Sequence, residues 1–138
     1  MKLSYALGFG VVVALIAGYL FYNQGAYNQV TLTPDQEQMI KIGYKCIDFG
    51  DRAVAKDTPI VEFQKLERMS KRANVIITCM QDNGYKVNPV WLKEAEPIAK
   101  AEAEKNKISF DEAMINISRR DMQILEPAKN KTGYWVKK

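Results

Sequence analysis

Apolar residues follow two distinct patterns along this chain. Between Leu3 and Tyr22 they form a run of twenty residues without a charge. At about 1.5 Å of rise per residue, a helix of this length just crosses the ~30 Å hydrocarbon core of a bilayer. Beyond residue 33, apolar residues recur at alternating spacings of three and four, the period of amphipathic helices. The pattern predicts one membrane-spanning helix followed by a helical domain.

Four helix starts are marked by a capping residue, in three cases with proline directly after it. The predicted caps are Thr33, Thr58, Asn88 and Ser109. The first helix should end near Lys56, the second at Asn83 and Gly84, the third near Lys105 and the fourth at Glu126 and Pro127. Pro97 should kink the third helix or divide it in two.

No strand-like alternation of useful length occurs, so the predicted fold class is all-α. We expect the apolar stripes of the four helices to face inward, including Ile60, Phe63 and Leu66 of the second helix. The predicted organisation is an anchor (1–23), a tether (24–33), a helical domain (34–127) and a basic, aromatic tail (128–138).

A cleaved signal peptide is the alternative to a retained anchor. Such a peptide needs a shorter apolar core and small residues at the third and first positions before the cut. A cut after Ala17 would place Leu15 at the third position, and a cut after Ala26 would place Gln24 there. The sequence favours a retained anchor.

Small residues recur every four positions within the apolar run and form one ridge along the predicted helix, at Ala6, Gly10, Ala14 and Gly18. Such a ridge lets another membrane helix approach closely, which favours a partner subunit in the membrane. Because seven of the twenty residues are Ala, Gly or Ser, chance spacing is the competing interpretation.

The charges around the run predict its orientation. Lys2 precedes it, and the first charges after it are Asp35 and Glu37. The positive-inside rule then puts the N-terminus in the cytoplasm and the domain outside. The segment from Cys79 to Tyr85 resembles a Cys-Met-x-x-x-Gly-Tyr turn of small exported bacterial proteins. This resemblance implies a bacterial chain, with its domain in the periplasm.

The net charge of +4 does not indicate a nucleic-acid partner. Lys2 and four lysines in the last twelve residues carry the excess, and residues 24–126 hold nearly equal numbers of basic and acidic residues. A nearly neutral body lacks the basic surface of a nucleic-acid-binding protein.

Cys46 and Cys79 are the two cysteines of the chain, which contains no histidine. Without histidine or a CxxC pair, neither a metal site nor a cofactor is predicted. In an oxidising compartment the two cysteines should form a disulfide. A regular helical hairpin turning near Asp57 would misplace them by about 16 Å along the helices. The bond therefore requires a bend at Gly50, a steep crossing or an early break in the second helix.

Carboxylates are the only candidate catalytic acids, and a hydrolase would require Asp48, Asp51 or Glu62 to lie buried beside a cleft. Asp111 and Glu112 follow the cap at Ser109, which suits the positive end of a helix. The sequence predicts surface and capping roles for these side chains, and no enzyme activity.

The tail combines aromatic and basic residues that suit an anionic lipid surface or an acidic partner, namely Tyr134, Trp135, Lys137 and Lys138. A frayed, solvated terminus is the alternative.

These features predict a small single-pass accessory or structural subunit of the bacterial inner membrane. Its helical domain would dock outside the cytoplasm on a larger membrane protein complex, without a small-molecule substrate. The alternatives are a cleaved, soluble periplasmic binding protein or inhibitor and, third, an envelope hydrolase.

Overall fold

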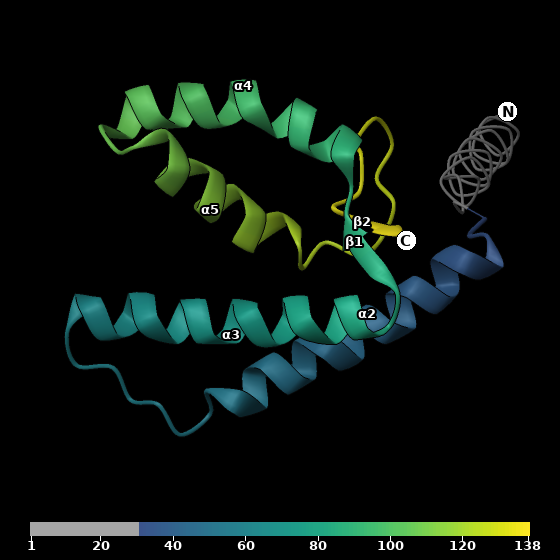
Figure 1. Cartoon of the computed structure of the whole chain (residues 1–138), viewed down its shortest axis with the longest axis horizontal. Coiled ribbons are helices and arrows are strands. Elements are labelled where there is room, and N and C mark those ends of the chain that lie inside the picture. Colours follow the sequence, from purple (N-terminus) through teal and green to yellow (C-terminus); the bar gives the residue numbers. More distant parts are fainter. Residues whose placement is uncertain (1–30) are drawn as a thin grey trace, which may run out of the picture. The chain divides into compact units, whose positions relative to one another are not determined.

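A computed structural model describes residues 31–138, which are mostly helical (Figure 1). The elements, in chain order, are α2 (Pro34–Ala53), α3 (Glu62–Asp82), β1 (Tyr85–Val87), α4 (Pro89–Asn106), α5 (Phe110–Asp121) and β2 (Trp135–Lys137). None of the helices in residues 31–138 is long and apolar enough to cross a membrane. The predicted anchor, with its ridge at Ala6, Gly10, Ala14 and Gly18, lies outside the described residues.

Three of the four predicted helix starts are confirmed by their capping hydrogen bonds. The hydroxyl of Thr33 accepts from the backbone N–H of Gln36, whose side chain accepts from the N–H of Thr33 at 2.9 Å. Asn88 caps α4 through the N–H of Val90 at 3.0 Å, and Ser109 caps α5 through the N–H of Glu112 at 3.1 Å. Each cap satisfies a donor that the first turn of a helix leaves free.

The predicted second start, at Thr58, is wrong. Helix α3 begins at Glu62, and a loop of eight residues (54–61) follows the end of α2 at Ala53. The side-chain oxygen of Gln64 accepts from the N–H groups of Ile60 and Val61, so a residue inside the helix supplies the cap. The prediction failed because the helix start was assigned to Thr58 and Pro59, whereas the capping side chain is that of Gln64.

Two other boundary predictions also need correction. Helix α4 continues through Pro97 as one helix, so Pro97 does not divide it, and the kink expected as the other outcome stays a prediction. Helix α5 ends at Asp121, five residues before the predicted end at Glu126. The apolar residues after Asp121 belong to a turn that leads into the C-terminal segment.

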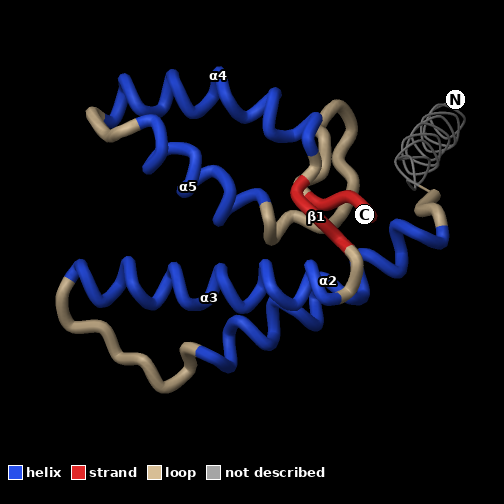
Figure 2. Tube along the Cα trace, in the orientation of Figure 1, coloured by secondary structure: helices blue, strands red, loops and turns tan. Residues whose placement is uncertain are grey.

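The helices form two hairpins, α2 with α3 and α4 with α5. Figure 2 shows β1 and β2 side by side between them. The strands are antiparallel, and Lys86 lies opposite Val136. The all-α prediction is confirmed for the class of the fold, but it did not include this short strand pair, because three-residue strands separated by almost fifty residues leave no alternation to detect.

The buried core draws on both hairpins and on the C-terminal residues. Its largest members include Ile76, Met80, Trp91, Ile117, Met122, Tyr134 and Trp135. All of these residues belong to the compact unit Leu32–Lys138, so this unit contains a complete core of its own.

Two glycines allow close packing on α2. A Cβ atom at Gly43 would lie 2.5 Å from Leu125, and one at Gly50 would lie 2.8 Å from Ile76. Close neighbours therefore lie against α2 at both glycines.

Candidate functional site

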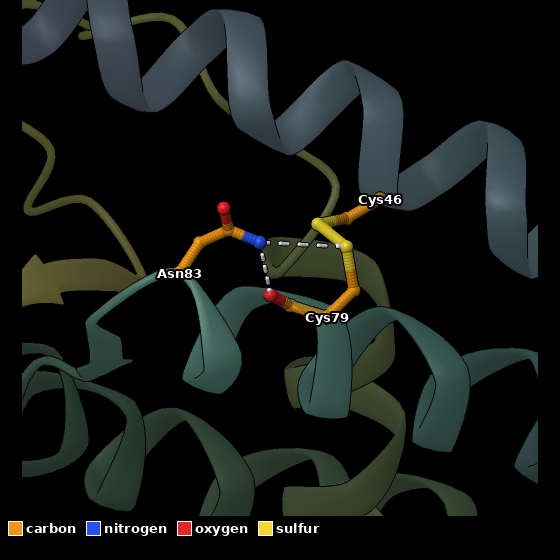
Figure 3. The surroundings of a disulfide bond; sticks show 3 residues. All are labelled: Cys46, Cys79 and Asn83. Atoms are coloured by element: carbon orange, nitrogen blue, oxygen red, sulfur yellow. Dashed lines mark hydrogen bonds between the residues drawn. A yellow bond between two sulfur atoms is a disulfide. The ribbon is translucent and has the colours of Figure 1, made fainter.

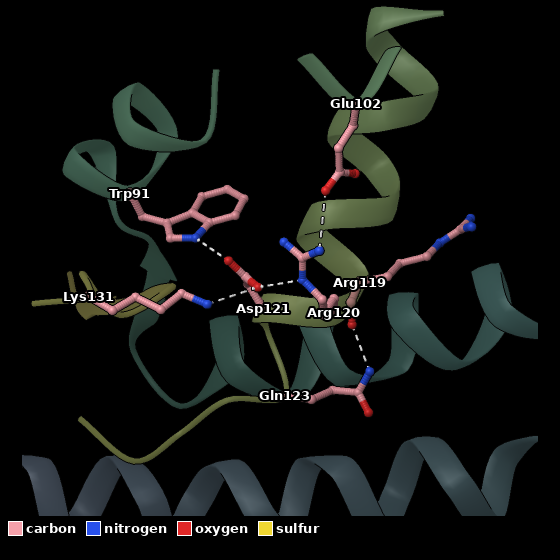
Figure 4. Close-up of polar contacts among 7 residues, drawn as sticks. All are labelled: Trp91, Glu102, Arg119, Arg120, Asp121, Gln123 and Lys131. Carbon is pink, nitrogen blue, oxygen red and sulfur yellow. Dashed lines mark hydrogen bonds and ion pairs between the residues drawn. The ribbon is translucent and has the colours of Figure 1, made fainter. Parts of the chain in front are cut away.

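Asp121 is the buried charged residue at the centre of the polar contacts in Figure 4. It is the last residue of α5, where the negative end of the helix dipole disfavours a carboxylate. Three donors compensate: Trp91 Nε1 at 3.0 Å, Arg120 Nε at 3.1 Å and Lys131 Nζ at 3.3 Å. The carboxylate thereby connects α4, α5 and the C-terminal segment.

Burial raises the pKa of Asp121, but the hydrogen bonds from Trp91, Arg120 and Lys131 outweigh that effect. The net pKa lies below the ordinary value of 3.8. A carboxylate that stays ionised with its acceptor positions occupied is a poor general acid or base at neutral pH. Its arrangement fits a structural role.

The C-terminal arm, defined here as residues 127–138, lies against both hairpins. Tyr134 packs edge-to-face on Trp91 with ring centroids 4.5 Å apart, and on Trp135 at 4.8 Å. Trp135 Nε1 donates to the carbonyl of Met122 at 2.9 Å. Both tail aromatics are about 5% exposed, so the prediction that Tyr134 and Trp135 contact lipid or a partner is wrong.

Lys137 and Lys138 remain exposed, but they make contacts within the domain. Lys137 pairs with Asp35 at 3.3 Å, and Lys138 Nζ donates to the carbonyl of Gln81 at 2.9 Å. The N–H of Lys138 also donates to the carbonyl of Gly84. The arm is thus part of the fold.

A pocket of about 250 Å³ lies between α2 and the arm. Its apolar lining includes Met39, Leu125 and Tyr134, and its acids are Asp121 and Glu126. Glu126 accepts a hydrogen bond from the hydroxyl of Tyr44, and Asp121 is bonded as described above. Polar atoms that already have partners offer little to a polar ligand, so the pocket suits a small apolar group.

The predicted disulfide between Cys46 and Cys79 is confirmed, with Cα atoms 5.5 Å apart (Figure 3). Asn83 Nδ2 donates to the carbonyl of Cys79 at 2.8 Å beside the bond. Helix α2 ends at Ala53, and the loop 54–61 continues in the direction of α2 past the first turns of α3 before α3 begins (Figure 1). This loop removes the expected mismatch along the helices. Two contacts hold this loop: Arg68 donates to the carbonyl of Val54, and Lys71 pairs with Asp57.

The three candidate hydrolytic carboxylates lie in surface ion pairs. Asp48 pairs with Arg52, Asp51 with Arg72, and Glu62 with Lys65. All three acid side chains are more than half exposed. Within residues 31–138, no group of three His, Cys, Asp or Glu side chains could hold a metal ion. The structure does not bring these acids into one site.

A second feature is an apolar surface that the sequence predicted to be buried. We call Phe63, Leu66 and Met69 of α3 together with Ile115 of α5 the open apolar face. These residues are 74%, 44%, 45% and 49% exposed. Ile60 and Val61, just before α3, are exposed as well. The expectation that this stripe faces inward is therefore wrong for the first two turns of α3.

The open apolar face lies, on both helices, on the N-terminal side of a contact between α3 and α5. Arg119 Nη2 donates to Ser70 Oγ at 2.6 Å, which joins the two helices. Figure 1 shows that α3 and α5 run in the same general direction and diverge toward their N-terminal ends. The spacing of apolar residues identified the stripe on α3. It could not show that the stripe extends beyond the part of the helix that other elements cover.

Comparisons of the chain with models of protein families, with curated proteins and with solved structures found no match.

Proposed function

We propose that this protein is a small single-pass accessory or structural subunit, anchored in the bacterial inner membrane by residues 3–22. Its helical domain docks outside the cytoplasm on a larger membrane protein complex. The open apolar face carries this proposal. Monomeric soluble proteins rarely expose contiguous apolar patches larger than a few hundred Å², and patches of that size commonly bind other proteins.

Two further features support the proposal. The disulfide Cys46–Cys79 suits an oxidising compartment, where such bonds persist. The charge-free run Leu3–Tyr22 has the length of a membrane-spanning helix. Asp121, whose carboxylate is occupied by structural bonds, gives no support to catalysis.

Native gel electrophoresis tests the docking. The full chain is extracted from its own membrane in mild detergent, and we expect it to migrate as part of a complex much larger than 15.7 kDa. Leu66→Asp should release the chain from that complex. Val90→Asp, a matched control at an exposed residue of α4, should not. Unchanged migration of Leu66→Asp would show that this face does not dock.

The membrane helix is tested separately. Replacing Gly10 and Ala14 by Ile should weaken association with the complex, because larger side chains prevent close helix packing. Full association of this double variant would leave the anchor as a simple tether.

A cleaved, soluble binding protein is a second candidate, and the pocket beside the C-terminal arm favours it. At about 250 Å³, this pocket is smaller than typical ligand sites of about 300–1,000 Å³, so we rank it second. The intact mass of the mature protein separates the two functions. Loss of the first 17 to 26 residues would exclude the anchor.

A further inference from the structure

The contact between Ser70 and Arg119 divides the faces of α3 and α5 into a closed part and an open part. Three residues beyond it lie Ala73 on α3 and Met122 directly after the end of α5, which are 8% and 2% exposed. Four residues before it lie Leu66 and Ile115, which are 44% and 49% exposed. Positions three or four apart share one face of a helix. The apolar face of each helix therefore continues beyond the part that is buried within the domain.

The spacing on α3 is that of a seam between helices. Phe63, Leu66, Ser70, Ala73, Ile77 and Met80 follow one another at spacings of three, four, three, four and three. This alternation is the pattern by which one helix packs against another. In the C-terminal half the seam is covered within the domain, and in the N-terminal half it is open.

Charges at the open end favour a cationic partner. Asp111 and Glu112 lie four and three residues before Ile115, and therefore on its face of α5. Both are exposed, and neither forms an ion pair within residues 31–138. Glu62, four residues before Leu66, adds a third carboxylate, and it is paired with Lys65. Three carboxylates thus border the apolar residues, against two cations: the ammonium group of Lys65 and the guanidinium group of Arg119, which donates to Ser70.

We propose that the open apolar face binds an amphipathic helix of a partner protein whose apolar stripe is flanked by lysine or arginine. This proposal rests on the proposed docking function and names the chemistry of the partner. Apolar side chains of the partner helix cover Leu66, Met69 and Ile115. Its cationic side chains lay their stems along Phe63 and place their charges at Asp111 and Glu112.

Designed peptides test this pairing on the unit of residues 32–138 with its disulfide intact. The probes are two labelled peptides of about four turns with leucine at heptad spacing, one with lysine and the other with glutamate at the remaining positions. Fluorescence anisotropy reports binding. We expect the lysine peptide to bind about tenfold more tightly than the glutamate peptide.

Variants then assign the binding to the face. Leu66→Asp should lower the affinity for the lysine peptide by about tenfold, whereas Val90→Asp should leave this affinity unchanged. Replacing Asp111 by Asn and Glu112 by Gln should reduce the preference for lysine over glutamate without removing the leucine-dependent binding. Circular dichroism confirms that each variant is folded.

Several results would overturn the proposal: equal affinity for both peptides, equal affinity of Leu66→Asp and Val90→Asp, or no binding of the lysine peptide. A dimer in sedimentation equilibrium that Leu66→Asp dissociates would assign the face to a second copy instead. Binding to anionic vesicles that Leu66→Asp abolishes would assign it to lipid. If the peptides fail but Leu66→Asp still releases the full chain from its complex, docking stands and only the class of partner is wrong.

Discussion

Trp91 Nε1 lies 3.0 Å from Asp121 Oδ2 in the interior of the domain, where it joins the beginning of α4 to the end of α5. The two residues are thirty positions apart, and the same carboxylate also holds Lys131 of the C-terminal arm. A single acidic side chain therefore orders three segments. Removing the charge of this side chain should therefore destabilise the domain.

Asp121→Asn should lower the free energy of unfolding at neutral pH by about 1–3 kcal/mol. The amide keeps the shape of the side chain but loses the charge-assisted bonds to Arg120 and Lys131. Urea unfolding of residues 32–138 measures the loss. Asp48→Asn, which breaks an exposed ion pair, serves as the control and should change stability by at most about 0.5 kcal/mol. Equal effects of the two variants would contradict a central role for Asp121.

The pH dependence of stability follows from the lowered pKa of Asp121. A carboxyl group whose pKa is lower in the folded state contributes stability above its unfolded pKa, and this contribution is lost as the pH falls through its folded pKa. The wild-type unit should therefore lose stability more steeply than Asp121→Asn below about pH 4. Urea midpoints at pH 7, 5, 4 and 3 compare the two proteins, and parallel curves would refute the assignment.

The disulfide should contribute about 4 kcal/mol of stability in the chain-entropy model, given the 33 positions between Cys46 and Cys79. Replacing both cysteines by alanine should lower the urea midpoint accordingly. Thiol titration of the unfolded, unreduced wild-type protein should detect no free thiol. Two titratable thiols would mean that the bond does not form in the mature protein.

Gly50→Ala should destabilise the domain by about 1–3 kcal/mol, because the new methyl group would meet Ile76 at 2.8 Å and the backbone oxygen of Arg72 at 3.1 Å. A backbone atom cannot move aside as a side chain can. Gly133→Ala is the matched control, since no atom lies within 4 Å of its Cβ position. Thermal unfolding followed by circular dichroism compares them, and equal melting temperatures would contradict close packing at Gly50.

Local signals predicted the helical class well. Thr33, Asn88 and Ser109 satisfy nearby backbone donors, and such bonds depend on residues two or three positions away. The compartment argument also led correctly to the bond between Cys46 and Cys79. Its geometric difficulty disappeared because a loop, unlike a helix, has no fixed rise per residue.

The sequence patterns did not reveal features that depend on contacts between residues far apart in the chain. The tail residues Tyr134 and Trp135 look like surface aromatics until Trp91 and the carbonyl of Met122 are placed beside them. No local signal distinguishes Asp121 either, because its partners Trp91 and Lys131 lie thirty and ten positions away. Conversely, Phe63 and Leu66 share the spacing of buried residues, but no element of the described domain extends far enough to cover them.

The pairing of β1 with β2 has a consequence for the order of events in synthesis. Tyr85 of β1 lies opposite Lys137 of β2. Tyr134 and Trp135 belong to the core shared by the two helical hairpins, whose residues are synthesised earlier. Helices α2 to α5 can form while the chain is being made, but their shared interior cannot close until residues 134–137 have emerged from the ribosome. The domain is therefore expected to complete its folding only after translation of these residues, in a single late step.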